Sequence, residues 1–279
     1  METVREVPPL RDRVRRARAS GRTIGFVPTM GALHEGHLSL VRLARQESAF
    51  SVVSIFVNPL QFGANEDFSR YPRKEGDDAA ALAREGVDVL YLPNPAAMYP
   101  GDFSTSVEVR GVSEGGEAGI RPGHFRGVST VVAKLFLQVA PDVAVFGQKD
   151  LQQASVVRRM IRDLDFPIRL VVGPTVREPD GLAMSSRNGY LSPDDRRLAA
   201  AFPRALFEGR DRAARGERDA ANLTESVRRE LEAAGLPPDY VDAVDPETMA
   251  PVEVAAPGTA LVAAVRIGKT RLIDNVPVP

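Results

Sequence analysis

Two histidines, His34 and His37, stand three residues apart in the segment 28–37, whose sequence is PTMGALHEGH. The segment follows a short apolar run that predicts a strand, and the residues after it predict a helix. Backbone N–H groups at a helix start favour a phosphate, and Gly31 and Gly36 let a nucleotide approach the backbone closely. The H-x-G-H pattern at such a turn is typical of nucleotidyl transfer, in which imidazoles stabilise charge that develops on a phosphate.

Two other roles compete for this histidine pair. A zinc site needs a third ligand, and we find none at a useful spacing in the sequence. Two buried histidines with ordinary hydrogen-bond partners also fit the pattern, because buried polar groups are satisfied in folded proteins. We favour the nucleotide interpretation because ligands of open α/β sheets bind at the carboxyl ends of strands, where this pair lies.

A lysine occupies the corresponding place after another predicted strand. Lys149 lies in the segment 146–153, with the sequence FGQKDLQQ, which opens a predicted helix. Only four of the 36 basic residues are lysines, so this context favours a phosphate contact over an ordinary surface charge. Asp150 beside it suits a helix N-cap.

A third candidate segment covers residues 176–188, with the sequence VREPDGLAMSSRN. Ser185, Ser186 and Arg187 offer two hydroxyls and a guanidinium that suit a phosphate. The tripeptide alone is common, and helix capping is its default role.

The elements that must position these segments alternate along the first part of the chain. We expect strands at residues 23–27, 51–57, 87–92, 143–146 and 168–172, and helices that include residues 10–17, 40–47, 74–85, 128–139 and 151–163. Residues 111–127 are rich in glycine and predict a loop. The alternation predicts an α/β fold with a doubly wound parallel sheet, Rossmann-like, over residues 1–175.

The remaining residues predict a smaller α+β domain over 176–279. Helices are expected at 194–215 and 219–234, and strands follow at 240–244, 260–267 and 270–273.

Composition excludes several classes of protein. The chain of 279 residues has no cysteine, which excludes disulfides, thiol catalysis and thiolate metal sites. No apolar stretch approaches the ~20 residues of a membrane span, and the first six residues lack the apolar region of a signal peptide, so we expect a cytoplasmic protein. A net charge of −1 does not indicate a nucleic-acid partner. The arginines of residues 11–18 fit a helix face exposed to solvent.

Six motifs, in order along nearly the whole chain, resemble the pantoate–β-alanine ligases, or pantothenate synthetases. They are residues 28–40 (PTMGALHEGHLSL), 54–63 (SIFVNPLQFG), 121–127 (RPGHFRG), 147–153 (GQKDLQQ), 181–188 (GLAMSSRN) and 271–275 (RLIDN). The family lies within the HIGH-type nucleotidyltransferases. Residues 184–187 resemble a shortened form of the mobile KMSKS loop of that group, with arginine where the group usually has lysine.

The resemblance implies a ligation in two steps for pantothenate and coenzyme A biosynthesis. The carboxylate of pantoate attacks the α-phosphate of ATP, which gives pantoyl adenylate and diphosphate. The amine of β-alanine then attacks the acyl carbon and releases AMP. The resemblance also implies Mg²⁺ held mainly by phosphates and water, a lid role for the smaller domain, and a homodimer formed through the N-terminal domain.

The resemblance assigns roles residue by residue. It implies ATP binding by Met30, Gly31, Ala32, Leu33, His34, Glu35, Gly36, His37, Gly147, Gln148, Lys149, Asp150, Val176, Met184, Ser185, Ser186 and Arg187. His34, His37, Lys149, Ser185, Ser186 and Arg187 would stabilise the transferring phosphoryl group. His37 matches the proton donor of the family, and electrostatic stabilisation is an equal alternative for it.

Further matches concern the other substrates and the metal. Gln61 matches a residue for pantoate and β-alanine, and Gln153 one for pantoate. A neutral amide both donates and accepts hydrogen bonds, which suits a hydroxy acid. Asp77 and Asp78 match an acidic pair linked to the metal, although by sequence alone they are charges in the first turn of a helix. His124 lies in a family motif, and a purely structural role is equally open for it.

Two rival functions come from other classes. Another nucleotidyltransferase of the same fold would make a nucleotide-linked product without ligation, and Gln61 and Gln153 argue against it. A nucleotide-binding module without activity would not need every proposed phosphate contact, and all of them are present. Length and charge disfavour an aminoacyl-tRNA synthetase.

Overall fold

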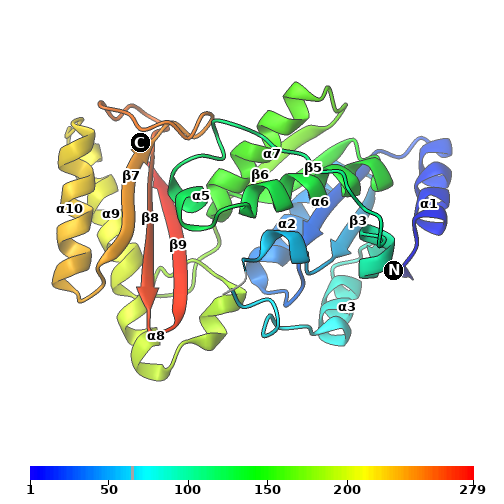
Figure 1. Ribbon diagram of the computed structural model, residues 1–279, viewed down its shortest axis with the longest axis horizontal. Coiled ribbons are helices and arrows are strands. Elements are labelled where there is room, and N and C mark those ends of the chain that lie inside the picture. Colours follow the sequence, from blue (N-terminus) through cyan, green and yellow to red (C-terminus); the bar gives the residue numbers. More distant parts are fainter. Residues whose placement is uncertain (64–65) are drawn as a thin grey trace. The chain divides into compact units, whose positions relative to one another are not determined.

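The computed structural model describes residues 1–63 and 66–279, and the chain divides into two compact units (Figure 1). The first unit comprises Met1–Arg110, Glu117–Gly147 and Val156–Gly173, and the second comprises Gly111–Gly116, Gln148–Ser155 and Pro174–Pro279. The main division falls between Gly173 and Pro174, beside the domain boundary expected after residue 175. The segment Gln148–Ser155, which carries Lys149, thus belongs to the second unit.

The first unit contains a six-stranded sheet in which every described pairing is parallel. Its strand order is β1-β4-β3-β2-β5-β6, with the bounds β1 Glu2–Val4, β2 Ile24–Thr29, β3 Phe50–Ile55, β4 Val89–Tyr91, β5 Val143–Gly147 and β6 Arg169–Gly173. The chain runs from β2 to β3 and β4 on one side, and then returns to β5 on the other side. The carboxyl ends of β2 and β5 therefore flank the point where strand order reverses, which is where such sheets bind ligands.

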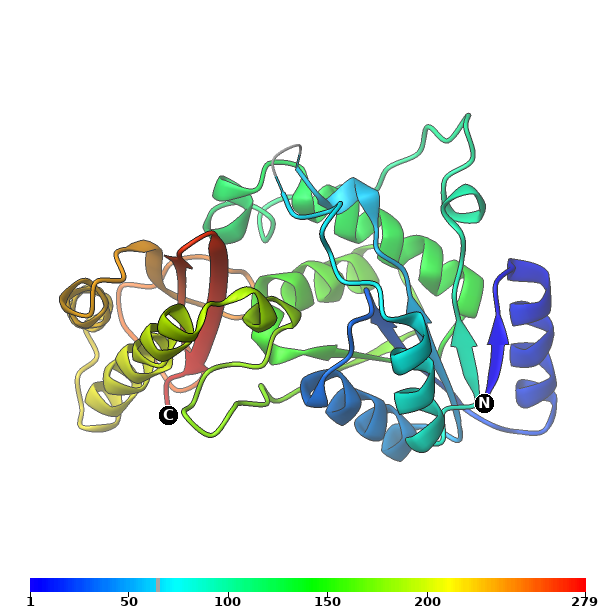
Figure 2. The same ribbon diagram turned by 90° about the horizontal axis from the view of Figure 1, so that it is seen from below.

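Helices cover both faces of this sheet, as the alternation of elements predicts (Figure 2). The helices that begin in the first two thirds of the chain are α1 Val7–Ala19, α2 Glu35–Glu47, α3 Glu75–Arg84, α4 Pro95–Met98, α5 Gly116–Ile120, α6 His124–Val139 and α7 Leu151–Asp163. On one face, Val27 of β2 packs with Val41 and Ala44 of α2. On the other face, Phe26 meets Phe136 of α6 edge to face, with ring centroids 6.4 Å apart. Neighbouring residues of β2 thus anchor opposite layers, and the prediction of a doubly wound sheet is confirmed.

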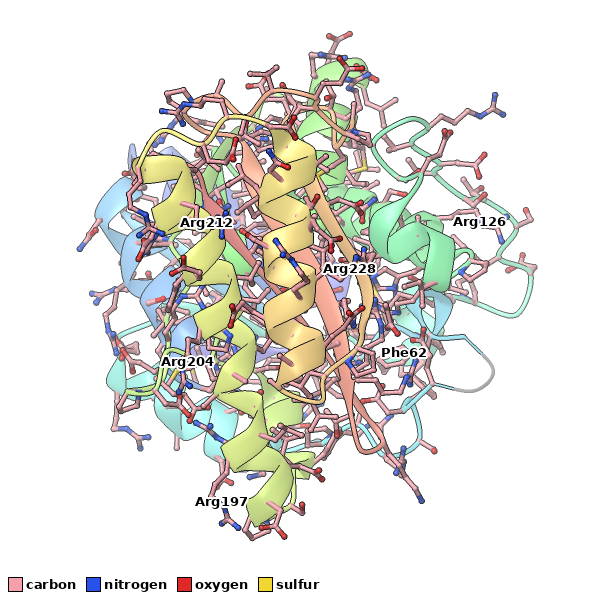
Figure 3. All side chains as sticks on the ribbon, turned by 90° about the vertical axis from the view of Figure 1, so that its left-hand side faces the viewer. Phe62, Arg126, Arg197, Arg204, Arg212 and Arg228 are labelled. Carbon is pink, nitrogen blue, oxygen red and sulfur yellow. The ribbon has the colours of Figure 1, made fainter. Side chains whose placement is uncertain are left out.

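The second unit contains a three-stranded antiparallel sheet in the order β7-β8-β9, with the bounds β7 Pro238–Val244, β8 Ala260–Ile267 and β9 Thr270–Pro277. Its helices are α8 Pro193–Ala199, α9 Ala201–Ala214 and α10 Ala220–Ala233. Leu223, Val227 and Leu231 recur at helical spacing on α10 and are buried in the core of this unit. The other sides of these helices carry charged side chains, among them Arg197, Arg204, Arg212 and Arg228, which Figure 3 labels.

Two local expectations are wrong, and one short strand was not expected. The single helix expected at 194–215 is divided at Ala200, because Pro203 has no N–H to donate to the carbonyl of Ala199. Residues 111–127 are not one loop, since α5 lies within them and α6 already begins at His124, after Gly123 with a φ of +80°. The short edge strand β1 was not expected, because three residues are too few for a periodic pattern.

In the described part of the chain, no helix has both the length and the apolar character that a membrane crossing requires.

Candidate active site

The turn after β2 is shaped by two residues with positive φ. Gly31 has a φ of +83°, and a Cβ atom there would lie 2.9 Å from Cγ2 of Ile55. Ala32 follows with a φ of +52°, which is costly for a residue other than glycine. The buried carboxylate of Asp78 accepts hydrogen bonds from the N–H groups of Ala32 and Leu33, both at 2.8 Å. The turn that leads into the two histidines is therefore held in place by a side chain from α3.

His34 and His37 lie together at the start of α2. His34 is the N-cap residue, and the centroids of the two rings are 4.2 Å apart. The backbone N–H of His34 donates to Nδ1 of His37 at 3.4 Å. Because Nδ1 of His37 accepts this bond, the proton of the neutral ring lies on Nε2. His37 can therefore donate a hydrogen bond from Nε2 at a helix N-terminus, where an anion is already favoured.

Glu35 between them has its carboxylate engaged elsewhere. Arg42, two turns later on the same helix, donates to it and also binds Glu85 at 2.7 Å. The hydrogen bond from Arg42 lowers the pKa of the Glu35 carboxyl. A contact of Glu35 with ATP would therefore use the backbone.

The amide of Gln61 lies beside the histidine turn. Gln61 is buried in the 3₁₀ helix Pro59–Gln61, and its Nε2 is 3.1 Å from Sδ of Met30. Its Oε1 accepts from Nδ2 of Asn58 at 3.0 Å. The structure thus brings together Met30 and Gln61, two residues that the sequence assigned to different substrates.

Asn58 is a residue that the sequence analysis did not assign to the site. It is 1% exposed, and its Nδ2 also donates to the carbonyl oxygen of Gly127 at 3.0 Å. Its Oδ1 accepts from the hydroxyl of Tyr99 at 2.8 Å. Asn58 therefore orients the amide of Gln61, so that Nε2 is its donor end. Its place in the motif 54–63 was the only indication in the sequence.

His124 is hydrogen-bonded to the backbone of Gln61. Nδ1 of His124 donates to the carbonyl oxygen of Gln61 at 2.8 Å, and Nε2 accepts from Arg121 at 3.1 Å. Arg121 in turn binds both carboxylate oxygens of Glu66, at 2.7 and 2.6 Å. Burial, followed by the charge of Arg121, lowers the pKa of His124 to about 4. His124 is therefore neutral at pH 7, and it supports the loop that carries Gln61.

Asp77 and Asp78 do not share one environment. Asp77 is exposed, whereas Asp78 is 3% exposed and has both oxygens bonded to the turn after β2. Among residues 1–63 and 66–279, no three His, Asp or Glu side chains cluster closely enough to hold a metal ion. The assignment of the pair to a metal stays a prediction, and the geometry favours Asp77 alone for it.

Lys149 lies in the second unit, in the 3₁₀ helix Gln148–Asp150 that follows β5. Its Nζ is 3.3 Å from Oδ1 of Asp150, and its side chain is 22% exposed. Asn275 of β9 donates from Nδ2 to the carbonyl oxygens of Gln148 and Lys149, both at 3.0 Å. The half-buried Gln153 follows on α7.

The hairpin at residues 176–184 carries the third candidate segment. Met184 donates its N–H to the carbonyl oxygen of Val176 at 3.0 Å, and Arg177 pairs with Ala183. Ser185 then caps the 3₁₀ helix Ser186–Tyr190 by accepting from the N–H of Arg187 at 3.2 Å. Capping is therefore one role of Ser185, as the sequence also allowed. Ser186 and Arg187 are half-buried in the same turn.

Comparison with known proteins identifies the family of this chain. The family model described as pantoate-beta-alanine ligase matches residues 2–277. The chain is 50% identical over 278 residues to the pantothenate synthetase of Rhizorhabdus wittichii, with 100% of this chain and 99% of the relative covered. It is 54% identical over 270 residues to that of Anaeromyxobacter dehalogenans, with coverages of 94% and 93%.

Solved structures show the same relationship. The crystal structure of pantothenate synthetase from Thermus thermophilus has a TM-score of 0.95 and 48% identity, over 100% of this chain and 99% of that one. The pantoate-beta-alanine ligase of Francisella tularensis, described as complexed with beta-gamma ATP and beta-alanine, has a TM-score of 0.81 and 32% identity, with coverages of 99% and 97%. By its sequence along almost its whole length, this chain belongs to the pantoate–β-alanine ligase family.

Proposed function

We propose that this protein condenses (R)-pantoate with β-alanine to pantothenate, at the expense of ATP, with AMP and diphosphate as products. The observation that carries the proposal is the contact between Gln61 and Met30 at 3.1 Å. It joins an oriented amide, suited to a hydroxy acid, to the turn and helix start that suit a nucleotide. The two glutamines that match pantoate contacts, Gln61 and Gln153, argue against a nucleotidyltransferase without a ligation step.

The first step is adenylation of pantoate. Its carboxylate oxygen attacks the α-phosphorus of ATP, and the bond to the bridging oxygen of diphosphate breaks. Negative charge moves onto the departing phosphates, where fixed donors lower the barrier. We assign the Nε2–H of His37, Nζ of Lys149 and the segment Ser185, Ser186 and Arg187 to these oxygens, with His34 supporting His37.

The second step is attack of the amine of β-alanine on the acyl carbon, with AMP as the leaving group. Gln61 and Gln153 hold pantoate through its hydroxyls and carboxylate in this proposal, and Gln61 also borders β-alanine. The relative from Francisella tularensis, solved with an ATP compound and β-alanine, supports the same two ligands here. Because the chain has no cysteine, an acyl thioester on the enzyme is excluded as an alternative intermediate.

Mg²⁺ enters the proposal only with the nucleotide. When bound, it neutralises phosphate charge and needs only one or two carboxylates, because phosphates and water supply its other ligands. Asp77 fits this requirement, since it is exposed, whereas both oxygens of Asp78 are committed to backbone N–H groups.

The same family relationship leads us to propose a cytoplasmic homodimer, with nucleotide and pantoate sites in residues 1–175 and a lid role for residues 176–279. Light scattering on the purified protein measures the oligomeric state directly.

The activity is tested by omitting one substrate at a time. With ATP, Mg²⁺ and pantoate alone, we expect diphosphate and an enzyme-bound adenylate, and positional isotope exchange within ATP. Addition of β-alanine should then release AMP and pantothenate in equal amounts. AMP formation only with all three substrates present, without isotope exchange, would exclude the adenylate route.

A further inference from the structure

The motif 271–275 has no role in the chemistry described so far, although it lies on β9 in the core of the second unit. Its last two residues, Asp274 and Asn275, are both 3% exposed. Polar side chains in such positions are costly unless their hydrogen bonds are complete. The hydrogen-bond partners of Asp274 and Asn275 therefore indicate their role.

Asn275 bonds the lysine segment with its whole side chain. Nδ2 donates to the carbonyl oxygens of Gln148 and Lys149, both at 3.0 Å, and Oδ1 accepts from Nε2 of Gln148 at 2.9 Å. These three bonds fix the 3₁₀ turn on both sides of the Lys149 backbone. A side chain without an amide cannot donate to two carbonyls and accept from a third group.

Asp274 bonds the other candidate phosphate segment through Arg177. The guanidinium of Arg177 binds both carboxylate oxygens, at 2.6 and 2.9 Å, and it donates to the carbonyl oxygen of Gly181 at 2.9 Å. Arg177 belongs to the hairpin that leads directly into Ser185, Ser186 and Arg187. It also donates to the carbonyl oxygen of Asn275 at 3.2 Å, so the two networks meet.

We infer that Asp274 and Asn275 are positioning residues for adenylation, which hold the Lys149 segment and the Ser185–Arg187 segment at one fixed separation. The inference deepens the proposed function and rests on it, because it requires Lys149 and Arg187 to contact the phosphates of ATP. Both segments must act on one polyphosphate at the same moment. A misplacement near 1 Å in such an arrangement costs about 10²-fold in rate.

The test compares Asn275→Ala with Thr270→Val in single-turnover adenylation. Thr270 is also buried on β9, at 7% exposure, but it lies outside the network, so its substitution measures disturbance of the strand alone. We expect Asn275→Ala to slow adenylation by roughly 10- to 100-fold, with little change in the KM for pantoate. Thr270→Val should leave the rate within about twofold.

A double-mutant cycle with Lys149→Ala separates positioning from general damage. If Asn275 acts through Lys149, the pair Lys149→Ala and Asn275→Ala should be little slower than Lys149→Ala alone. Losses that multiply would overturn the inference. If Lys149→Ala by itself leaves adenylation intact, the assignment of Lys149 in the proposed function has failed instead, whatever Asn275→Ala does.

A second variant keeps the test decisive if Asn275→Ala does not fold. Arg177→Lys preserves the charge beside Asp274 but cannot supply the planar set of donors to Asp274, Gly181 and Asn275. It should slow adenylation and show a similar lack of additivity with Arg187→Ala. The second half-reaction, started from synthetic pantoyl adenylate and β-alanine, should be nearly unchanged in both variants, because no diphosphate departs in it. A normal adenylation rate in Arg177→Lys would overturn the inference.

Discussion

Asp78 holds the backbone of Ala32 through a 2.8 Å hydrogen bond that spans 46 residues of sequence. The second oxygen of the same carboxylate accepts from the next residue, Leu33. An aspartate that the resemblance alone linked to a metal thus secures a turn with an unfavourable backbone conformation. His34, the N-cap of α2, follows that turn directly.

Asp78→Ala and Asp77→Ala form a matched pair that distinguishes support of the turn from metal binding. Asp78→Ala leaves two N–H groups without their acceptor in a buried place, so we expect a loss of about 2–4 kcal/mol in the free energy of unfolding. Asp77→Ala, at an exposed position, should change it by less than about 0.5 kcal/mol. Urea unfolding measures both. A stable Asp78→Ala with only a raised requirement for Mg²⁺ would contradict this role.

Gln61→Ala and Gln153→Ala should weaken the binding of pantoate, while the binding of ATP stays nearly intact. Each substitution leaves a polar group of the bound hydroxy acid unpaired, at a cost of about 1–3 kcal/mol. Calorimetric titration with pantoate and with a non-hydrolysable ATP analogue gives both affinities. Gln46→Ala, at an exposed position of α2, is the control and should bind both ligands normally. Equal losses for ATP and pantoate would remove the assignment of either glutamine.

Lys149→Ala should slow adenylation by about 10²–10³-fold, the cost of removing one donor to charge that develops in a transition state. Because the contact strengthens as diphosphate leaves, kcat should fall far more than KM rises. Lys269→Ala, at an exposed position of the same unit, is the matched control. Single-turnover rates and melting curves on both variants distinguish a phosphate contact from an ordinary surface charge. A near-normal rate for Lys149→Ala would return this lysine to an ordinary surface role.

His124 should make stability depend on pH in a defined window. Its pKa is about 4 in the folded protein, mainly through burial, against about 6.5 when the chain is unfolded. Between these values the unfolded chain binds more protons, so stability rises with pH across the window. Neutral His124 makes its full contribution to the free energy of unfolding above about pH 6.5. This contribution, about 3 kcal/mol, is lost as the pH falls toward 4.

The control for this pH dependence is His124→Gln. Glutamine can donate to the carbonyl oxygen of Gln61 and accept from Arg121, but it does not titrate. Chemical denaturation of both proteins at several pH values between 4 and 7 gives the difference that belongs to His124. Parallel pH profiles for the two proteins would show that burial of this ring has no such cost.

Most of the parallel sheet was predictable, because β2 to β6 lie in short apolar runs and helices follow β2 to β5 along the chain. The same logic located the histidine turn and the lysine turn, because ligand sites of this architecture lie at strand ends. The resemblance of six motifs then supplied the family, which the comparisons confirm. Local pattern therefore predicted most of the fold, whereas the site residues at these strand ends stay a prediction.

The parts that escaped prediction depend on partners distant in sequence. The sequence placed Asn58 in the motif 54–63 without a role, and its role appears in bonds to Gln61, Gly127 and Tyr99. The division between α8 and α9 required weighing one missing N–H against a helical pattern that continues across it. The sequence did not predict that Asp78 binds the turn after β2, because an aspartate in the first turn of a helix is ordinarily a surface charge.

The position of β2 has a consequence for the order in which the chain folds. Its pairing with β3 joins neighbouring segments, whereas its pairing with β5 is accompanied by a bond from Ile24 to Asp142 across 118 residues. During synthesis one edge of β2 therefore stays open long after the other is paired. Pairings of such sequence separation slow folding and leave a hydrophobic strand edge exposed to neighbouring nascent chains. We expect refolding yield to fall with protein concentration, and a mutation at the β2–β5 seam to affect yield more than one at the β2–β3 seam.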